Sequence, residues 1–239
     1  MTFMYSVSDG TEEVIGDIIV EVSGTFRTFN VGDTGPAGGT VFRVSEDGER
    51  GLEFAPEFIS NTLDPAQGFQ AFAWGCLGVD LDMFPNLEGF DQVTGEPLGS
   101  VQSGATSTQG IQNVACLDQA AESPASAAIL EASAYFRIQG NTNFGDWYLP
   151  SITELIELQR LFPDAVIQED NSSVSTAVLG ELTLWSSTEH TDELVWALCP
   201  FNGQPVPPVL VPRKDEASGT TVLNSFSVLP VRSFDTGFF

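Results

Sequence analysis

The chain has 239 residues, and its 33 acidic side chains against 8 basic ones give a formal net charge of -25. This balance excludes nucleic acid as a natural partner and leaves no polybasic anchor for an anionic membrane, because the basic residues are few and scattered. Hydrophobic residues make up 42% of the chain, which is enough for a large core and argues against disorder. No apolar run approaches the roughly 18 residues that span a bilayer. The first ten residues lack the features of a secretion signal, so the chain is either cytosolic or has its signal elsewhere.

The first 22 residues contain two strand-like runs, residues 3–10 and 17–22, around a turn rich in Gly, Thr and Glu. Two strands do not make a stable domain alone. The pattern Tyr5-x-Val7-x-Asp9-Gly10 resembles the last hairpin of the cadherin-like or bacterial immunoglobulin-like repeats of giant bacterial adhesins. That resemblance implies that residues 1–29 are the terminal strands of a preceding repeat or a linker, and that residues 30–239 form a separate ligand-binding domain.

Residues 32–39 form a glycine-rich segment that predicts a tight turn. Residues 40–44 and 51–56 alternate as half-buried strands on either side of an acidic turn, which predicts a hairpin. Residues 69–74 predict another strand. Residues 79–112 are rich in Gly, Ser, Thr, Asn and Asp and are too long for an ordinary connection, so we expect a functional or ion-held loop.

Two helices are predicted in the second half of the chain. Ser123 and Pro124 are typical of a helix start, and the following Ala-rich run predicts a helix to Gln139. A capping box at residues 151–154 begins a second helix, which Pro163 closes. An irregular stretch over 162–183, strands at 184–187, 194–199 and 228–234, and an extended Pro-rich segment at 205–208 complete the chain. Short strands, two helices and long loops predict an α+β domain.

Six motifs occur in order: Gly32-Asp33-Thr34-Gly35-Pro36-Ala37-Gly38-Gly39-Thr40-Val41-Phe42, Gly51-Leu52-Glu53-Phe54-Ala55-Pro56-Glu57, Trp74-Gly75-Cys76, Phe144-Gly145-Asp146-Trp147-Tyr148-Leu149-Pro150-Ser151, Trp185-Ser186-Ser187-Thr188-Glu189 and Val231-Arg232-Ser233-Phe234. Over residues 31–234 the chain resembles the family named for the C-terminal domain of the Legionella collagen-like adhesin. The resemblance implies a C-type-lectin-like fold, in which two helices flank small antiparallel sheets with long irregular loops. It identifies a scaffold, so function must be argued from the site.

In the lectin-like fold, long loops on one side carry ligand recognition, often through calcium. The loops expected there hold Asp164, Glu169, Asp170 and Asn171 in one stretch, and Glu189, His190, Asp192 and Glu193 in another. The motifs do not fix metal ligands, so this assignment rests on chemistry: Ca²⁺ takes 6 to 8 oxygen ligands, and a cation would neutralise clustered carboxylates. The alternative is a solvated acidic loop.

A second acidic group, with Asp80, Asp82 and Asp91, lies in the long loop after Cys76. Its start resembles a calcium loop, but Phe84 at the fifth position excludes an EF-hand, so we expect a structural calcium or an exposed acidic loop.

Several further residues receive roles. We assign His190 and Asn202 to ligand contact, and we expect Trp147 and Trp185 to lie in the core. Asp146 is expected to cap or bridge the backbone.

The chain has three cysteines, Cys76, Cys116 and Cys199, and no C-x-x-C spacing that suggests zinc or redox chemistry. A disulfide between Cys76 and Cys116 would suit an exported protein, although any two of the three could be paired on paper.

An enzyme is not expected. A single histidine excludes the H-E-x-x-H motif, and no G-x-S-x-G elbow occurs. The cysteines do not form the reactive pair of the formylglycine-generating oxidases that share the lectin-like fold. A pair of carboxylates for glycoside hydrolysis stays open, because it depends on their separation in space.

The leading hypothesis is a calcium-dependent ligand-binding module of a large secreted bacterial adhesin of the RTX type, monomeric within a long chain at the cell surface. Its ligand would be a peptide, a protein or a glycan on a host or biofilm surface, bound through Ca²⁺. The alternatives are a spacer domain that calcium only stiffens, and an enzyme on the oxidase-like fold.

Overall fold

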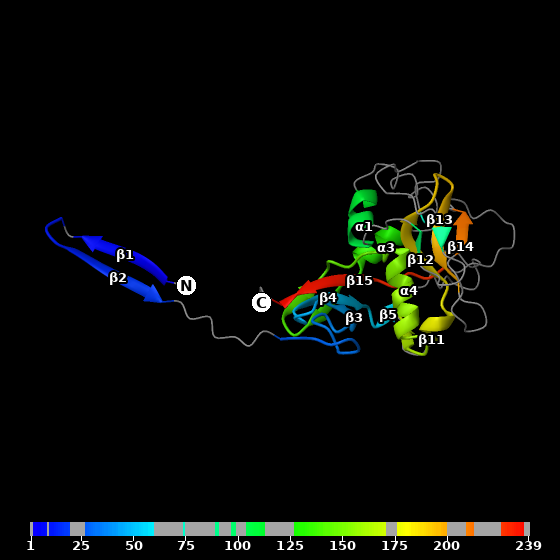
Figure 1. Cartoon of the computed structure of the whole chain (residues 1–239), viewed down its shortest axis with the longest axis horizontal. Coiled ribbons are helices and arrows are strands. Elements are labelled where there is room, and N and C mark those ends of the chain that lie inside the picture. The colour runs from blue at the N-terminus through cyan, green and yellow to red at the C-terminus, as the bar shows by residue number, and fades with distance from the viewer. Residues whose placement is uncertain are drawn as a thin grey trace.

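The computed structural model of the chain describes residues 2–8, 10–19, 27–59, 74, 89–90, 97–98, 104–112, 127–170, 176–199, 209–212 and 226–236. These residues form short helices and small sheets that are mostly antiparallel, as Figure 1 shows. The predicted α+β class is therefore confirmed. Within these residues, no helix has the length and apolar character needed to cross a bilayer.

The N-terminal segment forms a two-stranded hairpin that stands apart from the other sheets in Figure 1. Strands β1 (Thr2–Ser8) and β2 (Glu13–Ile19) pair antiparallel, with Ser8 opposite Glu13. Gly10 turns the chain with a φ of 91°, a conformation that glycine adopts without steric cost. Because this turn is tight, the second strand begins four residues earlier than predicted.

The central sheet has the order β15-β4-β3 and holds the predicted hairpin. Strands β3 (Thr40–Val44) and β4 (Arg50–Phe54) pair antiparallel with a bulge between Val41 and Arg43. Strand β15 (Val231–Asp235) comes from the far end of the chain and pairs with the other side of β4. The strand predicted at 228–234 therefore begins at Val231, while Val228 makes only an isolated bridge to Ile59.

Besides the N-terminal hairpin and the central sheet, the described residues form four more sheets. Strands β10 (Val166–Glu169) and β11 (Thr176–Val178) pair antiparallel, and β10 runs parallel to β5 (Glu57–Phe58). Strands β12 (Leu184–Glu189), β13 (Leu194–Leu198) and β14 (Val209–Pro212) form an antiparallel sheet. The two-stranded pairs are β6 (Gly89–Phe90) with β7 (Pro97–Leu98), and β8 (Arg137–Gln139) with β9 (Thr142–Phe144).

The described helices are α1 (Gly104–Gln112), α3 (Ala128–Ala134), α4 (Ile152–Leu161) and the 3-10 turn η1 (Leu179–Glu181). The predicted capping box of α4 is confirmed: the Ser151 hydroxyl accepts from the Glu154 N–H at 3.3 Å, and the Glu154 Oε2 accepts from the Ser151 N–H at 2.7 Å. These two bonds satisfy backbone donors that the first turn of a helix leaves free.

The other predicted helix was placed wrongly at its end. It was expected to run to Gln139, but it ends at Ala134, and Tyr135 has an extended backbone with a ψ of 138°. The following residues pair as β8 with β9 across Gly140, which has a φ of 60°. Tertiary pairing thus overrides the helical propensity of the Ala-rich run. Its predicted start at Ser123 and Pro124 lies outside the described residues.

Two stretches predicted to be irregular contain regular structure. Residues 162–183 hold β10, β11 and η1, and residues 79–112 hold β6, β7 and α1. These elements are too short for a periodic signal, and β10 depends on partners that are distant in the sequence. Of the strand predicted at 69–74, only Trp74 is described, and it is not in a strand; the segment 205–208 lies outside the described residues.

Among the described residues, the core comprises two large clusters and a smaller third one. Trp147 and Trp185 are both buried, which confirms their assignment to the core. Trp185 stacks on Phe226 with ring centroids 4.3 Å apart. The buried Trp74 donates its Nε1–H to the Ser186 carbonyl at 2.7 Å, so this motif tryptophan ties its segment to β12.

Gly39→Ala is expected to destabilise the protein by about 1–3 kcal/mol, because an added methyl group would overpack a closed contact. A Cβ at this position would lie 2.3 Å from the Phe54 carbonyl oxygen and 2.9 Å from the Glu53 Oε2. The matched control is Gly145→Ala, whose Cβ would meet nothing within 4 Å. Urea unfolding of both variants checks the prediction, and equal midpoints would contradict it.

Candidate functional site

A buried ion network joins residues from four of the sequence motifs. The Arg232 guanidinium donates from Nη1 to the Glu53 Oε1 at 2.7 Å, and from Nε and Nη2 to the two carboxylate oxygens of Asp146 at 2.8 and 2.9 Å. Glu53 is fully buried. The Ala37 N–H and the Gly39 N–H donate to the same Glu53 carboxylate at 3.1 and 2.9 Å. The glycine-rich turn is therefore shaped to wrap a buried carboxylate.

Arg232 also stacks on two motif aromatics, with its guanidinium carbon 4.8 Å from the Phe144 centroid and 5.9 Å from the Trp147 centroid. Burial acts to lower the pKa of Arg232, but the hydrogen bonds to Asp146 and Glu53 outweigh burial and raise the pKa. Asp146 was expected to cap or bridge backbone; it instead binds the Arg232 side chain. These motif residues thus form a connected scaffold around Arg232.

The first predicted calcium group is only partly brought together. Asp164 is exposed in the turn after α4, as the solvated-loop alternative predicts. Glu169 ends β10 and is 5% exposed. Asp170 is half-buried and donates its backbone N–H to the Phe58 carbonyl at 2.8 Å. Asn171 lies outside the described residues.

The second predicted group surrounds the turn between β12 and β13. Glu189 ends β12 and is 2% exposed. His190 is half-buried, its ring edge packs on Trp196 with centroids 5.5 Å apart, and its Nδ1 is buried with no hydrogen-bond partner among the described residues. Asp192 and Glu193 are exposed in the turn, which the Thr191 hydroxyl closes by accepting from the Glu193 N–H at 3.2 Å.

The two predicted groups lie in different sheets. Among the residues that the structure describes, no three His, Cys, Asp or Glu side chains come close enough together to hold a metal ion. Asp80, Asp82, Asp91, Asn202, Cys76 and Cys116 lie outside the described part, so their predicted roles stay predictions. Cys199 is a half-buried free thiol, and burial raises its pKa to about 11.

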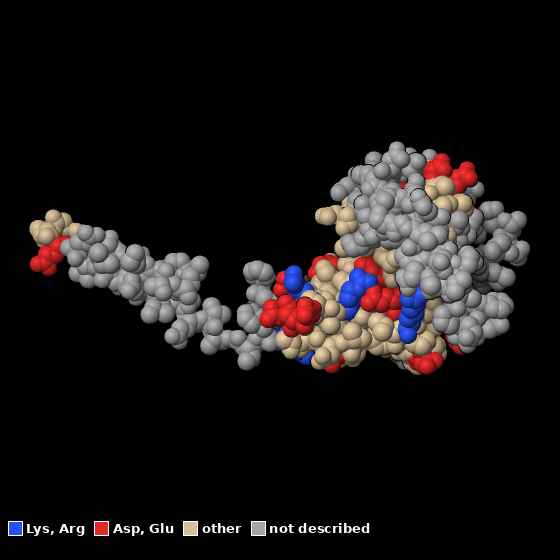
Figure 2. Space-filling model, viewed as in Figure 1, with Lys and Arg blue, Asp and Glu red and all other residues tan. Residues whose placement is uncertain are grey.

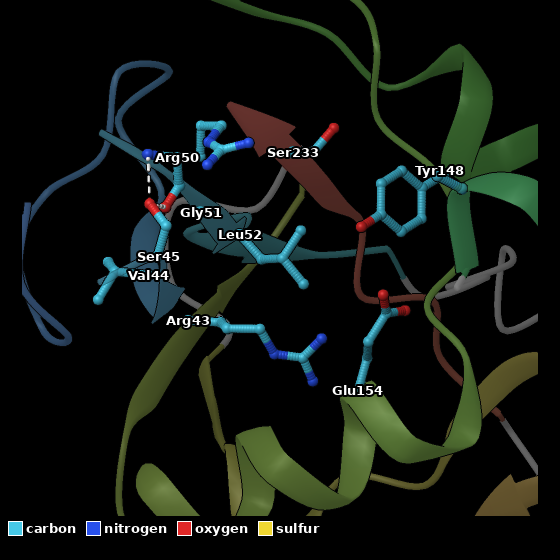
Figure 3. Close-up of a pocket in the computed structure, with 10 residues that line it drawn as sticks. Arg43, Val44, Ser45, Arg50, Gly51, Leu52, Tyr148, Glu154 and Ser233 are labelled. Atoms are coloured by element: carbon cyan, nitrogen blue, oxygen red, sulfur yellow. Dashed lines mark hydrogen bonds between the residues drawn. The ribbon is translucent and has the colours of Figure 1, made fainter. Parts of the chain in front are cut away.

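An open groove of about 540 Å³, which the sequence did not predict, lies between the β3–β4 hairpin, β15 and α4. Figure 3 shows it with Leu52 near the centre, Arg43 and Arg50 on two sides, and Tyr148 and Glu154 at the end next to α4. Its lining comprises Arg43, Val44, Ser45, Arg50, Gly51, Leu52, Ala105, Tyr148, Glu154 and Ser233.

The two arginines of the groove differ in how firmly they are paired. The Arg43 Nε donates to the Glu157 Oε2 at 2.9 Å, and its Nη2 contacts the same oxygen. Arg50 is 64% exposed, and its guanidinium lies 4.0 Å from the Asp47 carboxylate, at the limit of an ion pair. Elsewhere on the face shown in Figure 2, blue basic side chains are few and lie directly beside red acidic ones.

Glu154 closes one end of the groove from the first turn of α4. Its Oε2 accepts from the Ser151 N–H at 2.7 Å, the Ser151 hydroxyl at 3.1 Å and the Gly104 N–H at 3.1 Å. Burial raises the pKa of Glu154 and outweighs these bonds, which act to lower it. Burial also raises the pKa of Tyr148, and Glu154 adds to that shift. The pKa values of both side chains at this end of the groove are therefore raised.

One sequence signal could have pointed to the groove. Arg43 and Arg50 are two of only eight basic residues; Arg43 lies in the first strand of the predicted hairpin, and Arg50 directly precedes the second. What the sequence does not contain is the approach of β15 and α4, which turns that hairpin face into a groove.

No protein-family model matches the chain, and a search of curated proteins finds no significant match. The fold and the site define an α+β protein whose motif residues form a buried scaffold around Arg232, with an arginine-lined groove beside it.

Proposed function

We propose that the chain is a calcium-dependent ligand-binding module of a secreted bacterial adhesin, built on a C-type-lectin-like fold and displayed at the cell surface. The six motifs and the mixed arrangement of short helices and small sheets support the fold. Motif residues such as Glu53, Trp147 and Arg232 serve the core and the ion network, which supports a scaffold role for these motifs.

The observation behind the calcium proposal is the excess of acids, 33 against 8 basic residues, and their clustering at Glu169-Asp170-Asn171 and from Glu189 to Glu193. Glu169 and Glu189 are 5% and 2% exposed, and each ends a strand that leads into further acidic residues. A divalent cation would reduce the repulsion among neighbouring carboxylates in these stretches.

In this proposal Ca²⁺ would be held by Glu169 with Asp170 and Asn171, or by Glu189 with partners other than Asp192 and Glu193, because these three described acids do not come close enough together to hold the ion. The ion supplies a positive charge that can also bind oxygens of the ligand, either vicinal sugar hydroxyls or a peptide carboxylate. His190 follows Glu189 and is half-buried against Trp196, so the exposed part of its ring could contact a ligand. A spacer that calcium only stiffens is the competing function.

Millimolar Ca²⁺ is expected to raise the unfolding midpoint by roughly 5–10 °C over excess chelator, because a ligand of the folded state stabilises it by about 2.7 kcal/mol at 100 times its Kd. Glu169→Gln and Glu189→Gln remove one charge each and keep the side-chain shape, so the variant at the true site should lose most of this shift. Differential scanning calorimetry of each variant checks this.

Glu46→Gln is the matched control, because Glu46 is exposed in the turn between β3 and β4. An unchanged midpoint with calcium in the parent chain would refute the calcium proposal. A peptide and glycan array, read with calcium and with chelator, then separates binder from spacer: calcium-dependent signals support the module, and silence in both conditions supports the spacer.

A further inference from the structure

We propose that the groove between the β3–β4 hairpin, β15 and α4 is a second binding site, which takes a small ligand with a carboxylate next to an aliphatic group. Arg43 and Arg50 would bind the carboxylate, and the site would not need calcium. This inference does not depend on the calcium proposal.

The first argument concerns which of the few basic side chains are paired with acids. The structure commits Arg232 to Glu53 and Asp146, and Arg137 to Glu57. By contrast, the Arg50 side chain is 64% exposed with an acid only at 4.0 Å, and the Arg43 side chain is 46% exposed. Two of eight basic residues therefore line one concave surface with their head groups accessible.

The second argument is the geometry of the donors. A guanidinium has five N–H donors in a planar fork that matches the two oxygens of a carboxylate. Glu157 engages the Nε of Arg43 at 2.9 Å and also its Nη2, which leaves the Nη1 donors of that fork unused by Glu157. The Ser233 hydroxyl also lies in the lining and can donate to an anion, whereas the Ser45 hydroxyl already donates to Asp47.

The third argument is the character of the wall. Leu52, Val44 and Ala105 are half-buried and present aliphatic surface in the groove. Tyr148 is buried, so it does not offer the open ring face on which sugars commonly stack. Leu52 lies between Arg50 and Arg43 in Figure 3, which places an aliphatic contact directly beside the two cationic side chains.

The remaining charges near the groove belong to three acids. Glu154 stands at the α4 end with a raised pKa, Glu157 is paired with Arg43, and Asp47 is half exposed beside Arg50. The net charge of -25 repels anions at long range, but at physiological salt the screening length is about 8 Å. Local contacts therefore decide binding under those conditions.

The test is a calorimetric or NMR titration of the whole chain in chelator and about 0.15 M salt, with N-acetyl-leucine and its uncharged twin N-acetyl-leucinamide. Binding of the acid is expected in the millimolar range, as for other ligands of about this size. The amide should bind roughly tenfold more weakly, because it loses the charge-assisted hydrogen bonds.

Arg50→Gln and Arg43→Gln should each weaken binding of the acid several-fold, whereas Arg27→Gln should not, because Arg27 lies on Phe29 outside the groove lining. Far-UV circular dichroism confirms that each variant is folded. Equal binding of acid and amide, or equal binding by all three variants, would overturn the proposal. Tighter binding of glucuronate than of N-acetyl-leucine would overturn its aliphatic part. Because calcium is absent throughout, failure here is distinguishable from failure of the calcium proposal.

Discussion

Replacing Arg232 by methionine is expected to destabilise the protein by about 3–5 kcal/mol, the cost of leaving a buried charge without its partner. Glu53 is fully buried, whereas the Asp146 side chain is 58% exposed and can be solvated by water. Most of the lost stability therefore comes from leaving the Glu53 carboxylate buried without Arg232. That is a large fraction of the 5–15 kcal/mol that holds a typical domain together. Chemical denaturation, read by the fluorescence of the buried tryptophans, measures the change.

Two further variants make this prediction specific. Arg50→Met removes an exposed arginine, so it should cost about 0–1 kcal/mol. The double variant Glu53→Gln with Arg232→Met removes both buried charges and should be more stable than Arg232→Met alone. The effect of Glu53→Gln in the parent chain is the reference for this comparison. If Glu53→Gln destabilised the Arg232→Met variant as much as it destabilises the parent, the two side chains would not be acting as a pair.

Glu154→Ala is expected to cost about 2–6 kcal/mol, because it deprives two buried backbone donors of their acceptor at roughly 1–3 kcal/mol each. Those donors are the Ser151 N–H and the Gly104 N–H. Glu157→Ala, one turn along the same helix, removes only a partly exposed partner of Arg43 and should cost about 0–1 kcal/mol. Similar losses for the two alanine variants would show that Glu154 has no special role.

The pH dependence of Glu154 follows from the sign of its shift. Burial raises the pKa of this carboxyl in the folded state above its ordinary value of 4.5. The folded protein thus binds this proton more tightly than the unfolded chain does. The protonated carboxyl therefore contributes its full stabilisation at pH values below the ordinary pKa, and this stabilisation is lost as the pH rises through the raised pKa. Glu154→Gln, which mimics the protonated form, should therefore gain stability relative to the parent as the pH rises from about 4 to about 8. A difference that stays constant with pH would contradict the shift.

The parts of the fold that the sequence predicted are those with a complete local signal. The capping box at Ser151 and Glu154 contains both partners within four residues, and the hairpin of β3 and β4 contains its turn and both strands. The burial of Trp147 and Trp185 was also predictable, since large aromatics in ordered motifs seldom lie outside a core.

The parts that the sequence missed depend on distant partners. Strand β10 needs β5, about 110 residues earlier, and the end of α3 is decided by pairing between β8 and β9. The candidate site shows the same division. A run of acids can be read from the sequence, but its burial at Glu169 and Glu189 cannot. The arginine groove needs β15 and α4 beside the hairpin, and no local pattern encodes that approach.

Strand β15 is synthesised long after its partner β4, so the pairing of these two strands forms late. Arg232 and Glu53 are 179 positions apart, yet they face each other across one sheet. At a translation rate of 5–20 residues per second, Arg232 is synthesised about 10–40 seconds after Glu53. Closing so long a loop makes contact formation slow, and the earlier strands gain their full stability only then. Strand β15 is therefore needed to complete the central sheet. A chain truncated before it would leave the edge of β4 unpaired and Glu53 without its cationic partner Arg232.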